Sequence, residues 1–238
     1  MSNLLRRYIG SFALGLFILS IPLLLITSNV RWAFNDLRLY KFGFERNEVV
    51  ANTGFELSQL MSIAEDIRNY FNTNTELLEV INPADEEKTN LFNDREIMHM
   101  LDVKILLGNI YRVQEALAGY IAIYILWMLS ISRGRYAQIL LMQLTLGCIA
   151  TAGLLVFAGS ATAIGFDAVF EAFHVLSFTD GTWSFDPRSN YLTRLFTESF
   201  FLQASIAIAL ATILEAICII SLSTLIEKRY YHVGRDPN

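Results

Sequence analysis

The chain alternates between long apolar runs and polar segments, and this alternation is the strongest pattern in the sequence. The runs 8–30, 116–132 and 136–166 contain no charged residue, and a fourth, 199–226, contains a single one, Glu215. A helix of about 20 apolar residues is long enough to cross the hydrocarbon core of a bilayer. The pattern therefore predicts four membrane-spanning helices, at about 8–28, 113–132, 136–159 and 200–226.

The composition agrees with a membrane protein. Hydrophobic residues make up 54% of the 238 positions and charged residues only 17%, which is more apolar than an ordinary soluble domain of this size. We expect one mainly α membrane domain over residues 1–238. In this architecture a four-transmembrane-helix bundle carries two extracytoplasmic segments packed over its outer face.

The basic residues that flank the predicted spans indicate an orientation. Four spans leave both chain ends on one side of the membrane, and cytoplasmic flanks carry an excess of Lys and Arg. The two ends and the short turn between the second and third spans contain Arg6, Arg7, Arg133, Arg135, Lys228, Arg229 and Arg235. We therefore expect both termini in the cytoplasm. Segments 29–112 and 160–199 are then extracytoplasmic, and the functional residues should lie there.

Several classes of function disagree with the composition. A net charge of −5 argues against nucleic-acid binding. The two cysteines, Cys148 and Cys218, both lie in apolar runs, so each is expected to be a small buried hydrophobe rather than a disulfide partner or zinc ligand. We expect no cofactor and no resident metal. The chain also lacks the repeated halves that are typical of many transporters.

Two capping-box patterns predict helix starts in the first outer segment. Thr53 and Glu56 precede apolar residues at helical spacing, which predicts a surface helix over about 54–71. Asn93 and Glu96 form the second pattern, and the helix that begins there continues toward the second span.

The two outer segments each place one histidine beside acidic residues. Arg95, His99 and Asp102 share a helix face at i, i+4 and i+7. Asp167, Glu171 and His174 repeat that spacing on an amphipathic helix that resembles an interfacial one. A histidine on an apolar helix often only bonds a neighbour, but a nearby carboxylate can fix its tautomer and raise its basicity.

Four short stretches carry a resemblance. They are Arg95-Glu-Ile-Met-His-Met-Leu-Asp-Val-Lys104, Phe173-His174, Trp183-Ser-Phe185 and Leu195-Phe-Thr-Glu-Ser-Phe-Phe201. In this order they resemble a bacterial integral membrane protein family that includes the lipoprotein intramolecular transacylase. The resemblance implies a four-span enzyme of the bacterial cytoplasmic membrane, with His99 and His174 as the catalytic pair. It also implies a diacylated lipoprotein substrate whose sn-2 acyl chain moves to the amino group of its N-terminal cysteine, giving the lyso form.

The residues fit that chemistry. An attacking α-amino group, with a pKa of about 7.7 to 8.0, is mostly protonated at neutral pH and needs a base such as histidine. We expect Asp102 to orient His99 and Glu171 to orient His174. The oxyanion donor remains open among Arg95, Lys104, Arg194 and the second histidine, and Trp183 is a further candidate for contact with the substrate. If one reaction uses both histidines, they must converge in space.

Two alternatives stay open. The chain could be a non-enzymatic envelope or transport accessory protein, in which case replacing the histidines has no effect. It could also be a metallohydrolase that binds zinc through His99, His174 and either Asp102 or Glu171. Membrane phospholipid is an expected partner in every case, and the sequence does not indicate an oligomeric state.

An acid within a span is costly, so we expect Glu215 to face the bundle and bond Gln143 or Thr145.

Overall fold

The computed structural model describes residues 3–132, 137–179 and 182–233, and the side chains of 12–130, 137–179 and 182–229. Arg133, Arg135 and Arg235, on which the predicted orientation partly rests, lie outside the described residues, as do the side chains of Arg6 and Arg7.

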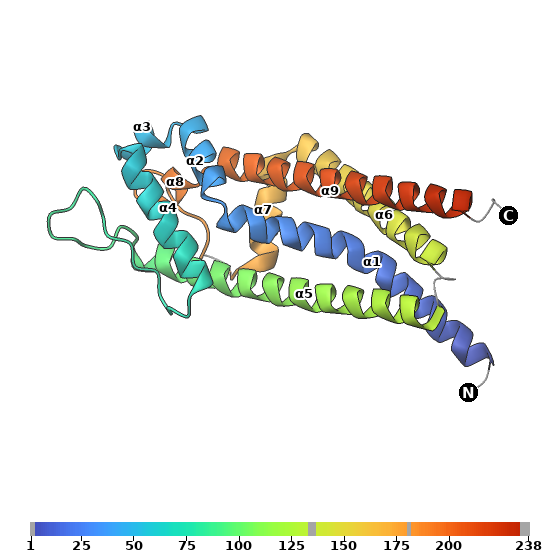
Figure 1. The fold of residues 1–238 in the computed structure, drawn as a ribbon. Helices are drawn as coiled ribbons and strands as arrows, with labels where there is room; N and C mark the ends of the chain where they lie inside the picture. Colours follow the sequence, from blue (N-terminus) through green and yellow to red (C-terminus); the bar gives the residue numbers. More distant parts are fainter. Residues whose placement is uncertain (1–2, 133–136, 180–181, 234–238) are drawn as a thin grey trace. The chain divides into compact units, whose positions relative to one another are not determined.

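The described secondary structure is helical, apart from one isolated β-bridge between Ile81 and Asn90. Along the chain the helices are α1 (Asn3–Asn35), α2 (Leu37–Arg46), α3 (Val49–Thr53), α4 (Leu57–Asn72), α5 (Asp94–Ser132), α6 (Ala137–Ile164), α7 (Phe166–Ser177), α8 (Tyr191–Leu195) and α9 (Glu198–Val233) (Figure 1). The mainly α prediction is therefore confirmed.

Four of these helices are long and apolar enough to cross a membrane, as predicted. The candidate spans are Phe12–Asn35, Asp94–Ser130, Ala137–Ile164 and Glu198–Arg229. The second has 37 residues, and at about 1.5 Å per residue it is far longer than a hydrocarbon core of about 30 Å. Its charged residues all precede Ala116, so the polar amino-terminal part of α5 lies outside the membrane-spanning segment.

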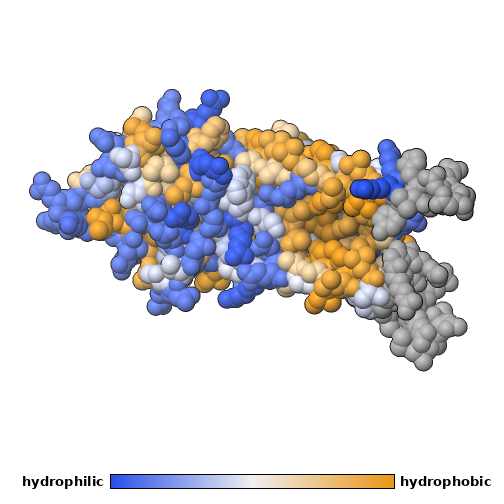
Figure 2. All heavy atoms as spheres, viewed as in Figure 1, coloured by the Kyte–Doolittle hydropathy of each residue, from blue (hydrophilic) through white to orange (hydrophobic). Residues whose placement is uncertain are grey.

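The chain divides into two compact units. Unit 1 consists of Met1–Asn29, Arg112–Ser160 and Ala209–Asn238, and unit 2 of Val30–Tyr111 and Ala161–Ile208. On the face shown in Figure 2, hydrophobic side chains gather over the helices of unit 1 and hydrophilic ones over unit 2. Unit 1 thus contains most of the membrane-spanning residues, and unit 2 contains both predicted outer segments.

The core of unit 1 is formed by apolar side chains from all four long helices. Phe17 of α1 stacks on Tyr124 of α5 with ring centroids 4.3 Å apart. Gly147 of α6 allows close contact with α1, because a Cβ there would lie 2.7 Å from Ile21. Cys148 is buried as predicted, whereas Cys218 is exposed on α9.

Glu215 has a different partner from the one predicted. Asn29 of α1 donates its Nδ2 hydrogens to Glu215 Oε2 at 2.7 Å and to Thr212 Oγ1 at 3.2 Å. The prediction of Gln143 or Thr145 is wrong, because Thr145 bonds Leu141 of its own helix. The buried Gln143 Oε1 has no partner among the described residues.

Unit 2 has its own hydrophobic core. Tyr40 and Phe44 of α2 pack with Phe196 and Phe200, and the ring centroids in this cluster lie 5.1 to 6.3 Å apart. The cluster joins the amino-terminal end of α9 to the first outer segment. Helix α2 can approach α9 this closely because position 43 has no side chain: a Cβ on Gly43 would lie 2.3 Å from the Phe200 ring.

We expect Gly43→Ala to lower the free energy of unfolding by about 1 to 3 kcal/mol, the usual range for overpacking a core. The rigid Phe200 ring is buried and has little room to move. Thermal unfolding in detergent measures the effect. Gly108→Ala is the matched control, because nothing lies within 4 Å of a Cβ there, and alanine should stabilise α5 by about 0.5 to 1 kcal/mol.

One of the two predicted capping boxes is confirmed. Asn93 Oδ1 accepts from the backbone N–H groups of Arg95 and Glu96, while Glu96 Oε2 accepts from the N–H of Asn93. The box predicted at Thr53 is wrong, because Gly54 at φ 77° ends the short α3 and the capping box of α4 forms between Glu56 and Gln59.

Glu96 also joins the two outer segments. Its carboxyl is almost fully buried, and Oε1 accepts a 2.8 Å hydrogen bond from the backbone N–H of Leu192 in α8. The Glu96 carboxylate therefore accepts from two backbone N–H groups, one at the start of α5 and one at the start of α8. This bridge holds the second outer segment against the helix that carries His99.

Candidate active site

The two outer histidines meet within unit 2, as predicted. His99 of α5 and His174 of α7 are 6% and 8% exposed, and their ring centroids lie 6.2 Å apart with an interplanar angle of 23°. No hydrogen bond joins the two rings in the described part of the chain. A small reacting group could therefore contact both imidazoles.

The hydrogen bond of His174 defines its tautomer. Nδ1 lies 2.7 Å from the carbonyl oxygen of Phe170, one helical turn earlier. A carbonyl oxygen only accepts, so Nδ1 must carry the proton. The neutral ring then has an unprotonated Nε2, which can accept a proton from a reacting group.

His99 is held in an apolar environment. Its ring lies edge-on to Phe178 at 4.9 Å and to Phe185 at 5.5 Å, and its buried Nδ1 has no hydrogen-bond partner among the described residues. Burial, with a smaller contribution from the charge of His174, lowers the pKa of His99 to about 4. His99 is therefore neutral at pH 7, so the two imidazoles are not both positively charged.

The low pKa of His99 predicts acid sensitivity. His99 takes up a proton near pH 6.5 in the unfolded chain but only near pH 4 in the folded chain. Its neutral form therefore contributes fully to the free energy of unfolding above pH 6.5, and this contribution is lost as the pH falls toward 4. At about 1.4 kcal/mol per pKa unit the loss is about 3 kcal/mol. Unfolding measured at several pH values should show this slope in the wild type. A His99→Asn variant should lack this part of the slope, and equal slopes in both proteins would contradict the assignment.

Aromatic side chains enclose His174. Trp183 lies 5.1 Å from it between centroids, Phe170 4.2 Å and Phe178 5.5 Å. The indole nitrogen of Trp183 is buried and has no partner in the described structure. The site therefore combines two imidazoles with one unused N–H donor.

The three candidate cations make structural contacts. Arg95 donates from Nη2 to the Ser184 carbonyl oxygen at 2.9 Å, and its guanidinium lies over the Phe185 ring. Lys104 donates to Thr75 O at 2.5 Å beside the Tyr70 ring. Arg194 donates to the carbonyl oxygens of Pro187 and Arg188. The partners of Arg95 lie next to the histidines, because Ser184 adjoins Trp183 and Phe185 packs against His99.

Neither predicted orienting carboxylate bonds its histidine. Asp102 is half-buried and Glu171 is exposed, and no hydrogen bond joins Asp102 to His99 or Glu171 to His174 in the described residues. The prediction is wrong for a local reason. In α7 the backbone carbonyl at i−4 reaches His174 Nδ1 first, and in α5 the His99 ring turns toward Phe178 and Phe185.

The described residues contain no group of three His, Cys, Asp or Glu side chains placed to hold a metal ion. The set required for a metallohydrolase, with His99, His174 and a carboxylate, is therefore not assembled. Phe170 and Phe178 are site residues that the sequence pattern did not predict. The position of Phe170, four residues before His174 on a helix, is the signal that identifies its carbonyl oxygen as a partner.

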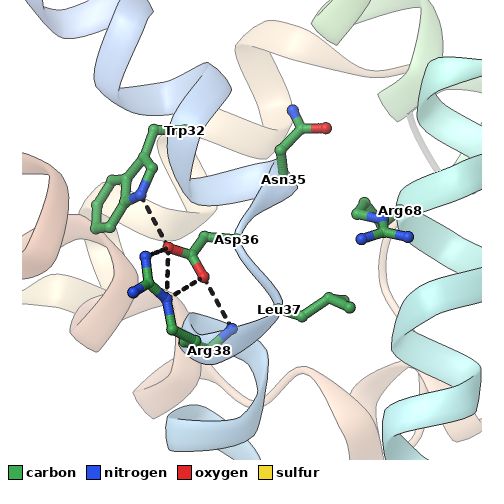
Figure 3. A pocket seen from close by; sticks show the side chains of 6 residues that line it. All are labelled: Trp32, Asn35, Asp36, Leu37, Arg38 and Arg68. Carbon is green, nitrogen blue, oxygen red and sulfur yellow. Dashed lines mark hydrogen bonds and ion pairs between the residues drawn. The ribbon is translucent and has the colours of Figure 1, made fainter.

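A separate pocket of about 350 Å³ lies at the junction of α1 and α2, lined by Trp32, Asn35, Asp36, Leu37, Arg38 and Arg68 (Figure 3). Asp36 accepts from Trp32 Nε1 at 3.0 Å and from the Arg38 guanidinium. Hydrogen bonds from Arg38 lower the pKa of Asp36 to about 2. None of the predicted site residues lines this pocket.

Comparison with known proteins gives a family and a fold. No curated protein matches the sequence. The structure is similar to that of the membrane integral lipoprotein intramolecular transacylase Lit from Bacillus cereus, with a TM-score of 0.80, 20% identity, and coverage of 95% of this chain and 99% of the other. Two variants of that protein, with a histidine replaced by alanine or arginine, give TM-scores of 0.78 and 0.73 at 20% identity. They cover 97% and 98% of this chain and all of theirs.

At this identity the structural likeness shows the fold. The sequence supplies the family, because the family model described as lipoprotein intramolecular transacylase Lit matches residues 15–201. That match extends over both outer segments and the histidine pair. The chain is therefore a member of the lipoprotein intramolecular transacylase family.

Proposed function

We propose that this protein transfers the sn-2 acyl chain of a diacylglyceryl lipoprotein to the amino group of the same molecule's N-terminal cysteine. The observation that carries the proposal is the buried pair of facing imidazoles, with the His174 tautomer fixed by Phe170. Membership of the transacylase family supports the substrate class.

His174 is the base in this proposal. Its Nε2 takes a proton from the attacking amine while the amine nitrogen bonds to the ester carbonyl carbon. The resulting imidazolium then returns the proton to the glyceryl oxygen as the C–O ester bond breaks. His99 is neutral and accepts a hydrogen bond from the amine, which positions the nitrogen for attack. Because both reacting groups belong to one substrate, orientation can supply much of the rate enhancement.

The proposed orientation in the membrane follows the charge pattern. Both termini lie in the cytoplasm, and the segments that carry His99 and His174 lie outside the bacterial cytoplasmic membrane, where phospholipid surrounds the four spans. Membrane-impermeant thiol labelling of single cysteines in intact cells tests this orientation. A cysteine at exposed Ser184 should react, and one placed after Asn238 should react only after lysis.

The activity assay uses purified protein in detergent and a synthetic lipopeptide whose sn-2 acyl chain is isotopically labelled. Intramolecular transfer leaves the parent mass unchanged, removes the free amine and places the label in amine-linked fragments in tandem mass spectrometry. A mixture of labelled and unlabelled lipopeptides should give no crossed products.

Other outcomes identify other functions. Loss of an acyl chain with gain of water, sensitive to a chelator, would indicate a metallohydrolase. Unchanged lipopeptide under conditions where the protein stays folded would favour a non-enzymatic role. Crossed products would show transfer between molecules and would contradict the intramolecular route.

A further inference from the structure

We propose that the indole N–H of Trp183 is the oxyanion donor of this reaction. It hydrogen-bonds the carbonyl oxygen of the migrating acyl group as that oxygen gains charge. The inference rests on the proposed function and assigns the group that stabilises the tetrahedral intermediate.

The first observation is an unused donor. Three buried side-chain nitrogen or oxygen atoms lack a hydrogen-bond partner in the described residues, and two of them, His99 Nδ1 and Trp183 Nε1, belong to this site. A buried indole N–H normally finds an acceptor. It can only donate, so a substrate carbonyl oxygen matches its chemistry.

The second observation is that the two residues that follow Trp183 are held in place. Arg95 holds the Ser184 carbonyl oxygen, and Phe185 packs against His99. The Trp183 ring itself lies against His174, which we assign as the base. A donor fixed before the reaction is the arrangement that stabilises developing charge most effectively.

The third observation concerns the competing donors. Lys104 and Arg194 bond the backbone carbonyl oxygens of Thr75 and Pro187, and neither contacts the histidine pair in the described part of the chain. Arg95 reaches the site through Ser184 and is therefore a positioning residue for Trp183.

The chemical step balances without a co-reactant. When the amine nitrogen bonds to the carbonyl carbon, the π pair moves onto the carbonyl oxygen, which accepts from Trp183. Collapse restores the C=O bond, breaks the ester C–O bond and leaves the proton from His174 on the glyceryl oxygen. Trp183 keeps its own proton throughout.

The test compares two tryptophans. Trp183→Phe keeps an aromatic ring beside His174 but removes the N–H, so kcat should fall by about 10²- to 10³-fold while KM and Tm change little. Trp32→Phe is the matched control, because the indole N–H of Trp32 already donates to Asp36 (Figure 3). This variant should lose some stability but no activity. Benzothienylalanine at position 183, which replaces N–H by sulfur at the same shape, should reproduce the Phe result.

The pH profile separates an oxyanion donor from a residue that only positions the base. Loss of a donor lowers kcat/KM at every pH and leaves the apparent pKa in place. Loss of a contact that orients His174 would shift that pKa. A shifted profile with an unchanged plateau would overturn the assignment.

Binding provides a readout that does not need turnover. In protein labelled with ¹⁵N at its three tryptophans, a lipid phosphonate that mimics the tetrahedral oxyanion should move the Trp183 indole proton downfield and leave that of Trp32 unchanged. Full activity in Trp183→Phe, or an unmoved signal with the phosphonate bound, would overturn the assignment of Trp183 as oxyanion donor but not the proposed function. A folded wild type that transfers no acyl chain overturns both proposals.

Discussion

Replacing His174 by asparagine is expected to reduce acyl transfer by about 10²- to 10⁴-fold, the range typical of removing a general base. Asparagine can still donate from its side-chain nitrogen to the Phe170 carbonyl oxygen, as Nδ1 of His174 does. Asparagine has no group at the position of Nε2, so it cannot take the proton from the amine. The variant should therefore fold normally and bind the lipopeptide but leave the ester intact in the tandem mass spectrometry assay.

Glu171→Gln is the matched control for this experiment, because Glu171 is exposed on the same helix and does not bond His174 in the described structure. It should retain full activity. If instead Glu171→Gln were inactive and His174→Asn active, the proposed base would be wrong.

The second large effect is expected on stability. Glu96→Ala should lower the free energy of unfolding by about 2 to 4 kcal/mol, because it leaves the buried N–H of Leu192 and the part-buried N–H of Asn93 without their acceptor. Glu96→Gln keeps one oxygen and should lose roughly half as much. Thermal unfolding and proteolysis of the outer segments measure the change.

Glu65→Ala provides the comparison for Glu96. Glu65 forms an exposed pair with Arg68 on α4, and such surface pairs contribute about 1 kcal/mol or less. A loss at Glu96 no larger than at Glu65 would contradict the structural role of the bridge between α5 and α8.

The sequence could predict the features that depend on local pattern. Long apolar runs predicted four apolar helices, and Asn93 predicted the start of α5. The repeated acid–histidine spacing on two amphipathic segments led to the prediction that His99 and His174 lie close together. In each case the information lies within one helix, or in the need for one reaction to use both residues.

The rest depends on contacts that local spacing does not encode. Asp102 and Glu171 have suitable spacing, but a backbone carbonyl and aromatic rings occupy the histidines instead. The partner of Glu215 lies on α1 rather than α6, because the order of helices around a bundle cannot be read from their faces alone. Trp183 was one candidate among several until the contacts of Arg95, Lys104 and Arg194 were known.

The composition of unit 2 has a consequence for biogenesis. Its two stretches are separated in the chain by the membrane-spanning residues of α5 and α6, and its core includes Phe200 at the start of α9. During synthesis, the hydrogen bond between Glu96 and Leu192 and the contact between His99 and His174 can therefore form only after the third long helix has been made. The pair of His99 and His174 cannot form in a nascent chain that stops after two long helices. An incompletely inserted protein therefore lacks the assembled histidine pair, and the core of its first outer segment lacks Leu192, Leu195 and Phe200.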